Sequence, residues 1–203
     1  MTLQETSRRR VAAGIGITVA ALAGAAWLRI RKEMPQSRVI SQWRVSQVEW
    51  RASQTAQEAV RRLWTLTFEQ PDGSAVEMSD FRGKPLLVNF WASWCPYCWE
   101  EMPRLNRFYA KNRANDWELL GLAVDRASAV QSFLRRSPVD FPIGIAQENG
   151  LDLLRQLSGE AGLPFLVLFD ADGAPRRRAP AGGDDEDLAG WRNTLQSWRS
   201  GSN

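Results

Sequence analysis

The residues whose types and spacing point most directly to chemistry are Cys95 and Cys98, the two cysteines of the chain. A thiolate attacks disulfides and binds metals, and a Cys-x-x-Cys pair can close and reopen as a disulfide. Two cysteines placed at random would show this spacing only about once in 100 cases. The spacing therefore predicts that the two sulfurs act as a pair, with reversible thiol–disulfide exchange as the leading chemistry.

The sequence of 203 residues contains no histidine. This excludes a Ser-His-Asp triad, a Cys-His protease, histidine-ligated zinc and a Cys-x-x-Cys-His haem site, because each requires an imidazole. A single Cys-x-x-Cys pair also provides only two of the four ligands that structural zinc prefers. Two other interpretations of the pair stay open. One is a structural disulfide, whose short loop would stabilise little, and the other is transient binding of Cu(I).

The segments on either side of the cysteines predict a strand, a turn and a helix. The apolar, β-favouring residues 85–91 run into the pair, and a charged stretch from Cys95 to about Asn112 favours a helix. The first turn of a helix carries unpaired backbone N–H groups and the positive end of the dipole, which stabilise a thiolate. We therefore expect Cys95 to attack a disulfide and Cys98, about one turn later, to resolve the mixed disulfide.

Apolar runs elsewhere predict an α/β sandwich with a mixed sheet, because strand–helix–strand units are followed by a hairpin and a last helix. The expected strands are 63–69, 75–78, 85–91, 117–124, 141–145, 164–169 and 174–180. The expected helices are 54–63, 95–112, 127–136, 151–157 and 184–198. The first two strands would form a hairpin across the turn at 71–73.

The N-terminal region carries the excess of positive charge. Residues 1–62 hold eleven Lys and Arg against four Asp and Glu, whereas residues 63–203 hold fifteen against nineteen. The basic balance therefore does not indicate a nucleic-acid-binding face. The eighteen residues from Val11 to Leu28 carry no charge and are just long enough to span a membrane. Both an uncleaved anchor and a cleaved export signal fit this segment.

The sequence thus predicts three regions. Residues 1–32 would be a signal anchor or export signal with a transmembrane helix, and residues 33–62 a partly helical tether. Residues 63–203 would form the α/β domain that carries the cysteines.

The stretch FRGKPLLVNFWASWCPYCWEEMP, residues 81–103, resembles the thioredoxin-like thiol:disulfide oxidoreductases of the bacterial TlpA/ResA group. The resemblance covers about residues 63–198 and includes a Gly-Leu-Pro sequence before the last apolar strand. It implies a thioredoxin fold, with a central mixed sheet flanked by helices and an N-terminal β-hairpin extension. It also implies a redox-active Cys95–Cys98 disulfide, with no other cofactor and no metal.

The resemblance also implies a surface that binds the partner chain. Leu163 and Pro164 match the cis-proline of the family, which faces the cysteines and offers backbone hydrogen bonds to a partner. With Trp94, Pro96 and Tyr97, which surround the cysteines in sequence, they are the expected substrate-binding residues.

Two carboxylates match acidic residues of the family. Asp125 matches an acid near the resolving cysteine and would accept the proton of Cys98, and the alternative is an ordinary Asp that ends a strand or caps a helix. Glu101 also matches a family residue, but we expect it on a solvated helix face.

Two departures from the family concern specificity and direction. Phe165 follows the expected cis-proline where many relatives carry Thr, which would alter the partner groove. The dipeptide Pro96-Tyr97 places proline first, as in glutaredoxins and strong oxidants, whereas relatives that act as reductants often place it second. Because a more stable thiolate makes a more oxidising protein, the direction of electron flow stays open.

The expected function is reduction of disulfides in partner proteins of the bacterial periplasm, with re-reduction by a membrane electron donor. The protein would be a monomer, held in the inner membrane by Val11 to Leu28 as a single span or exported as a soluble protein. The resemblance suggests clients such as apocytochrome c, in cytochrome c biogenesis, and the copper subunits of an oxidase. The alternatives are an oxidant that donates its disulfide, a copper-delivery or assembly factor for a respiratory oxidase, and a peroxidase.

Overall fold

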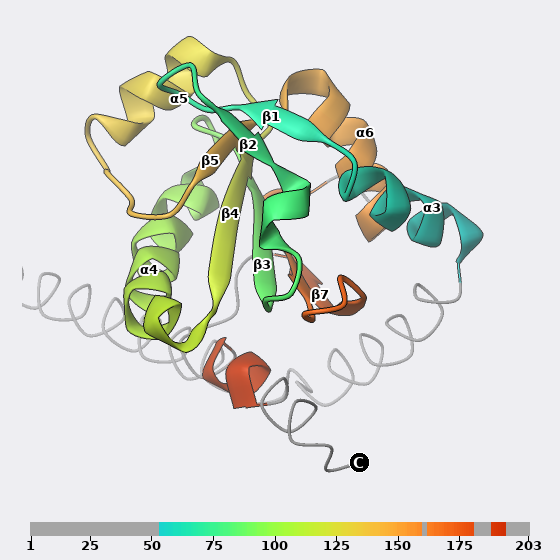
Figure 1. Cartoon of the computed structure of the whole chain (residues 1–203). Helices are drawn as coiled ribbons and strands as arrows, with labels where there is room; N and C mark the ends of the chain where they lie inside the picture. The colour runs from blue at the N-terminus through green and yellow to red at the C-terminus, as the bar shows by residue number, and fades with distance from the viewer. Residues whose placement is uncertain (1–52, 160–161, 181–187, 194–203) are drawn as a thin grey trace, which may run out of the picture. The chain divides into compact units, whose positions relative to one another are not determined.

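The structure is a computed structural model that describes residues 53–159, 162–180 and 188–193 (Figure 1). All of these residues belong to the compact unit Gln47–Asn203. The predicted anchor, residues 1–32, and most of the predicted tether lie outside the described residues. Within the described ranges, no helix combines the length and the apolar character needed to cross a bilayer.

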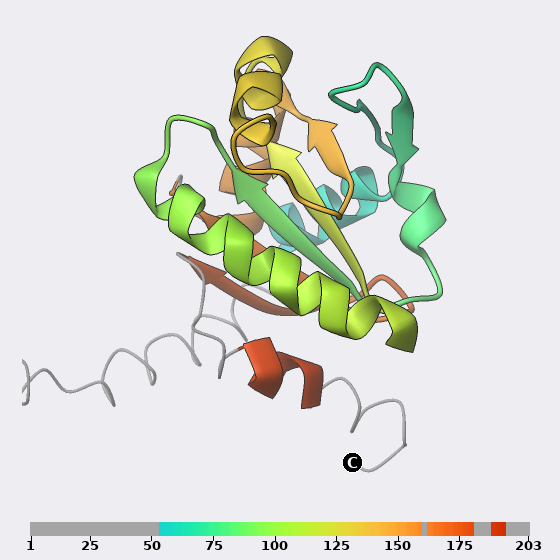
Figure 2. The ribbon, with the colours of Figure 1, turned by 90° about the vertical axis from the view of Figure 1, so that its left-hand side faces the viewer.

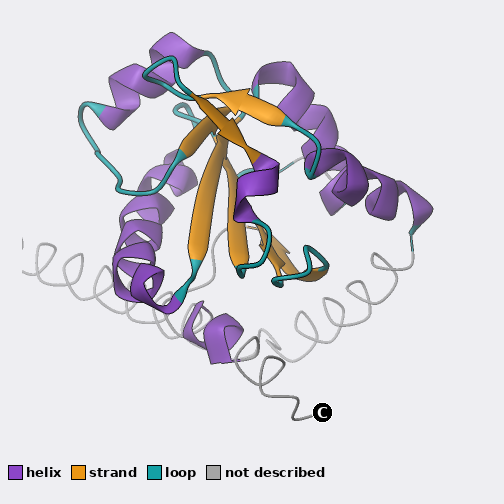
Figure 3. Ribbon diagram, in the orientation of Figure 1, coloured by secondary structure: helices purple, strands orange, loops and turns teal. Residues whose placement is uncertain are grey.

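A seven-stranded mixed sheet forms the centre of the fold (Figure 3), in the order β2–β1–β5–β4–β3–β6–β7. β3 pairs in parallel with β4 and antiparallel with β6, so the strand that leads to the cysteines is central. The strands are β1 (Thr67–Glu69), β2 (Ala75–Glu77), β3 (Leu86–Trp91), β4 (Glu118–Ala123), β5 (Ile143–Ile145), β6 (Phe165–Phe169) and β7 (Pro175–Pro180). The predicted α/β architecture with a mixed sheet is confirmed.

Helices cover both faces of the sheet. They are α3 (Gln54–Leu63), α4 (Pro96–Asn112), α5 (Ala127–Leu134) and α6 (Gln147–Ser158), with the 3₁₀ turns η1 (Met78–Phe81) and η2 (Arg113–Asn115). α4 and α5 lie on one face, and α3 and α6 lie on the other (Figure 1). Figure 2 shows α4 in front of the sheet, running roughly along β3 and β4.

The alternation of side chains along β3 explains this two-sided covering. Leu86, Val88 and Phe90 pack into the core beneath α3 and α6, whereas Leu87 and Trp91 pack into the core beneath α4 and α5. All six residues of β3 are buried. A strand buried on both faces reads as a continuous apolar run, which is why the sequence identified it.

α3 has the bounds that the sequence predicted. Its N-cap Ser53 accepts a hydrogen bond from the Ala56 backbone N–H at 3.5 Å, and its apolar stripe is buried and packs against α6. The stripe consists of Ala56, Ala59, Val60 and Leu63. α3 therefore belongs to the compact fold, although the sequence placed it in the tether. The strand expected at 63–69 begins only at Thr67, because Leu63 completes the helix.

The C-terminal part of the fold is described in pieces. α6 begins at Gln147, one turn earlier than predicted. Residues 188–193 are helical, and their Leu188 and Trp191 are buried in the core beneath α4 and α5. The acidic start of the predicted last helix, residues 184–187, lies outside the described residues.

An ion pair joins the starts of β3 and β4. Lys84 donates to Glu118 Oε1 at 2.7 Å, and the Glu118 backbone N–H donates to the Pro85 carbonyl at 2.9 Å. The hydrogen bond and the negative charge of Glu118 raise the pKa of Lys84 above its ordinary value of 10.5. This pair lies at the start of β3, at the opposite end of the strand from the loop that leads to the cysteines.

Candidate active site

Cys95 and Cys98 lie at the beginning of α4 and form a disulfide with a Cα–Cα separation of 5.3 Å. Cys95 is the N-cap residue, with extended backbone (φ −92°, ψ 111°), and Pro96 occupies the first helical position, where its missing N–H costs nothing. The Cys98 backbone N–H donates to Cys95 Sγ at 3.3 Å. Local sequence thus places the Cys95 sulfur at the positive end of the helix, as predicted.

The two sulfurs differ in their position within the core. Cys98 is fully buried on the inner face of α4, and Cys95 is only 3% exposed at the helix tip. A partner sulfur can therefore reach the pair only by contacting the residues around Cys95.

The peptide bond between Leu163 and Pro164 is cis, as the sequence predicted. Pro164 immediately precedes β6, and Phe165 pairs with Phe90, the penultimate residue of β3. The cis-proline therefore lies at the same end of the sheet as the loop that leads to Cys95. Leu163, which is partly buried, packs against the hydrophobic cluster that contains both cysteines.

The side chain of Phe165 does not form part of this edge of the site. It is 4% exposed and packs in the other cluster, beneath α3 and α6. The expectation that Phe165 alters the partner groove is wrong. The reason is that Phe165 begins β6, so the alternation of the strand turns its side chain into the core.

Asp125 follows β4 and accepts hydrogen bonds from Ser93, in the loop before Cys95. Its Oδ2 accepts hydrogen bonds from the Ser93 backbone N–H at 3.0 Å and from Ser93 Oγ at 2.5 Å. Its Oδ1 accepts from the Arg126 backbone N–H at 2.7 Å. Within the described part of the chain, no hydrogen bond joins Asp125 to Cys98. The contacts are those of a strand-end Asp that holds a neighbouring loop, thirty-two positions away in sequence.

Glu101 is buried, and the expectation of a solvated helix face is wrong. Its side chain is 1% exposed and lies on the inner face of α4, in the series Cys98, Glu101, Met102 and Leu105. These positions are i, i+3, i+4 and i+7, which fall on one face of a helix. That spacing was present in the sequence and could have placed Glu101 beside Cys98.

Three aromatic side chains near the disulfide are exposed: Trp94, Tyr97 and Trp99. The sequence predicted Trp94, Pro96 and Tyr97 to be substrate-binding residues, and this stays a prediction; Pro96 is exposed with the two aromatic side chains. Trp99 was not among the residues expected from the sequence. Its Nε1–H donates to the Ser93 carbonyl at 2.7 Å, so the indole is held against the loop that precedes Cys95. The signal in the sequence was a large apolar residue on the outer side of a helix start.

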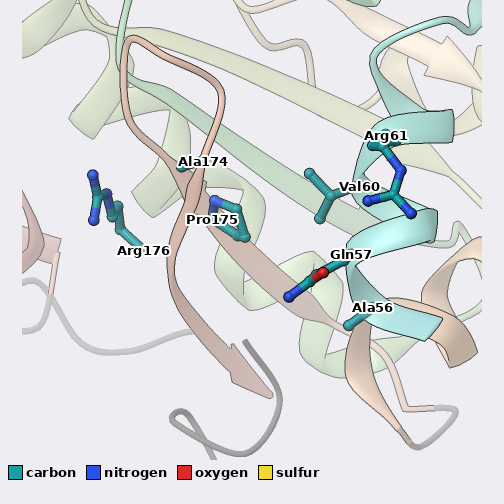
Figure 4. A pocket seen from close by; sticks show the side chains of 7 residues that line it. All are labelled: Ala56, Gln57, Val60, Arg61, Ala174, Pro175 and Arg176. Atoms are coloured by element: carbon teal, nitrogen blue, oxygen red, sulfur yellow. The ribbon is translucent and has the colours of Figure 1, made fainter. Parts of the chain in front are cut away.

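The described residues contain no group of three or more Cys, Asp and Glu side chains placed to hold a metal ion. An open pocket of about 350 Å³ lies between α3 and the start of β7, and Gln57 and Val60 extend from α3 toward Pro175 across it (Figure 4). Neither cysteine nor the cis-proline lines this pocket.

The fold and the site together define a thioredoxin-like protein with a Cys-x-x-Cys pair. A sequence profile of the AhpC/TSA family matches residues 61–178, and the chain belongs to this family. This chain is 34% identical to the thiol-disulfide oxidoreductase ResA of Bacillus thuringiensis subsp. konkukian over an aligned segment of 103 residues. The aligned segment makes up 50% of this chain. This chain matches 58% of the length of that relative.

Solved structures share the fold. A secreted Mycobacterium tuberculosis disulfide oxidoreductase, described as homologous to E. coli DsbE, superposes with a TM-score of 0.54 at 24% identity, covering 68% of this chain and 99% of its own. A putative protein disulfide isomerase from Bacteroides thetaiotaomicron gives a TM-score of 0.56 at 28% identity, covering 64% and 84%. The predicted thioredoxin-like fold is confirmed.

Proposed function

We propose that this chain is a thiol:disulfide oxidoreductase that reduces disulfides of partner proteins. The observation that carries the proposal is the Cys95–Cys98 disulfide at the start of α4, with the cis Leu163–Pro164 bond at the same end of the sheet. The named activity of the relatives, which are similar over about half of this chain, supports it.

In the first step, the reduced protein attacks a client disulfide through Cys95. A bond forms between Cys95 Sγ and one client sulfur, and the other client sulfur leaves as a thiolate that takes up a proton. The Cys98 backbone N–H, which contacts Cys95 Sγ at 3.3 Å, and the dipole of α4 stabilise the attacking thiolate.

In the second step, Cys98 loses its proton and attacks Cys95 Sγ. The Cys95–Cys98 disulfide forms and the second client sulfur leaves, so two electrons pass from the protein to the client. A thiol donor, for which we propose a membrane protein, then reduces the pair again.

A carboxylate close to Cys98 would accept its proton, because the chain has no imidazole. We propose Glu101 for this role, since it is buried on the same face of α4, three residues after Cys98. Asp125 is the second candidate, and its contacts with Ser93 favour a role in holding the loop.

We also propose that residues 1–32 place the domain in the bacterial periplasm, either as a single membrane span from Val11 to Leu28 or as an export signal. The uncharged segment and its flanking arginines support this placement. We propose that the domain acts as a monomer on exported clients, with apocytochrome c or an oxidase copper subunit as candidate classes.

The second candidate function is donation of a disulfide. The position of Cys95 at the helix start favours its thiolate, and a stabilised thiolate raises the reduction potential. Equilibration of the protein with glutathione, followed by quantification of the oxidised fraction, separates the two directions. Reduction predicts a potential near that of reducing thioredoxins, about −270 mV, and a value near about −120 mV would establish the oxidant instead.

A further inference from the structure

The exposed aromatic residues of the fold gather at one place. Among the described residues, the large hydrophobic side chains that stay exposed are Trp94, Tyr97 and Trp99, at 64%, 68% and 49%. Each is the direct sequence neighbour of Cys95 or Cys98. Exposed apolar side chains that cluster in this way mark interaction surfaces in monomeric proteins.

Trp99 is held in place before any partner binds. Its indole N–H donates to the Ser93 carbonyl at 2.7 Å, and the N–H and hydroxyl of Ser93 are themselves bound by Asp125 at 3.0 and 2.5 Å. A ring that is already fixed loses little rotamer freedom on binding, so more of its contact energy contributes to affinity.

The position of this surface determines what touches it. Cys95 is 3% exposed, and the exposed Trp94 and Tyr97 directly adjoin Cys95 and Cys98 in sequence. A client sulfur that bonds to Cys95 therefore brings the client residues next to it close to these aromatic side chains. The surface is continuous with the disulfide site that the proposed function requires.

We propose that Trp94, Tyr97 and Trp99 form a selective surface for client segments that carry an apolar side chain beside the reacting cysteine, with Trp99 as the fixed anchor. The inference rests on the proposed function and names its substrate class. The three rings carry no formal charge, and burying an apolar neighbour against them removes the most hydrocarbon surface from water.

The experiment uses the reduced full chain and measures second-order rate constants for disulfide reduction. The substrates are three peptide disulfides that differ only in the residues beside the cysteine, which are Leu, Lys or Asp, together with hydroxyethyl disulfide as a small neutral substrate. We expect the Leu peptide to react about tenfold faster than the Asp peptide, as a single well-packed contact at an interface allows.

The variants separate anchoring from general damage. Trp99→Ala should slow the Leu peptide about tenfold and leave hydroxyethyl disulfide unchanged, because the small substrate does not reach the ring. Trp99→Phe keeps an aromatic ring but loses the N–H donor, and should give an intermediate rate. Lys111→Ala, at the far end of α4, is the matched control and should leave all four rates unchanged.

Equal rates for the Leu, Lys and Asp peptides, or an equal loss on every substrate in Trp99→Ala, would overturn the inference. A wild-type dimer that Trp99→Ala converts to monomer in analytical ultracentrifugation would also overturn it, by assigning the surface to self-association. Failure of the proposed function is distinct, since the wild type would then not reduce hydroxyethyl disulfide at all.

Discussion

Removal of the Asp125 carboxylate distinguishes its two candidate roles, which are to hold the loop at Ser93 and to accept the proton of Cys98. Asp125→Ala deletes the hydrogen bonds from the Ser93 N–H and hydroxyl, which measure 3.0 and 2.5 Å. Hydrogen bonds to a charged acceptor contribute about 1.5–3 kcal/mol each, and we take the lower end because the site is half-buried. The variant should therefore lose about 3 kcal/mol of unfolding free energy.

The assay is urea unfolding of the oxidised protein, followed by tryptophan fluorescence. With a slope of about 2 kcal/mol/M, Asp125→Ala should lower the midpoint by about 1.5 M. Asp125→Asn keeps a neutral acceptor oxygen and should lose about half as much free energy. Asp152→Ala, which removes an exposed carboxylate from an i,i+3 ion pair with Arg155, is the control and should change stability by less than about 0.5 kcal/mol.

A double-mutant cycle with Ser93→Ala then tests the contact itself. If Asp125 holds Ser93, the two substitutions should be non-additive by about 1 kcal/mol or more. An unchanged midpoint in Asp125→Ala, combined with slower release of client from the mixed disulfide, would refute this reasoning and identify Asp125 as the proton acceptor for Cys98.

Two further predictions concern other carboxylates. Glu101→Gln should slow the release of client from the mixed disulfide about 100-fold without slowing the initial attack, as single-turnover kinetics would show. The control Glu100→Gln, at an exposed neighbouring position, should leave both steps unchanged. Equal effects of the two substitutions would remove Glu101 from the mechanism. Glu118→Gln should lower the free energy of unfolding at neutral pH, because it removes the ion pair with Lys84. The difference from wild type should disappear as the pH rises through the raised pKa of Lys84, because the ion pair contributes fully only below the unfolded value of 10.5. A difference that persists at higher pH in denaturation curves would contradict the role of the pair.

The core of the fold could be predicted because burial on both faces leaves a signal in the sequence. β3 is apolar at five of its six positions, and the expected strand at 85–91 agrees with Leu86–Trp91. The start of α4 was equally clear, since Pro96 suits the first position of a helix. The strand expected at 63–69 was too long, because its apparent alternation included Leu63, which faces inward from α3.

The parts of the site that depend on distant contacts could not be predicted. Nothing near Ser93 in sequence indicates that Asp125 binds it, because the two residues meet only when β3 and β4 pair. The burial of Glu101 conflicts with the usual position of a glutamate, and only its spacing from Cys98 indicated it. The hydrogen bond from Trp99 Nε1 to the Ser93 carbonyl depends on the backbone conformation of the loop, which the sequence pattern does not indicate.

The most direct test of the central claim is covalent trapping on single-cysteine variants. The reduced Cys98→Ser variant is mixed with the Leu-flanked peptide disulfide and examined by intact mass spectrometry with peptide mapping. The account predicts an adduct of one peptide on Cys95, because the residue that would release it is gone. The Cys95→Ser variant should form no such adduct, since Cys98 is fully buried. Trapping by Cys95→Ser alone would contradict the account.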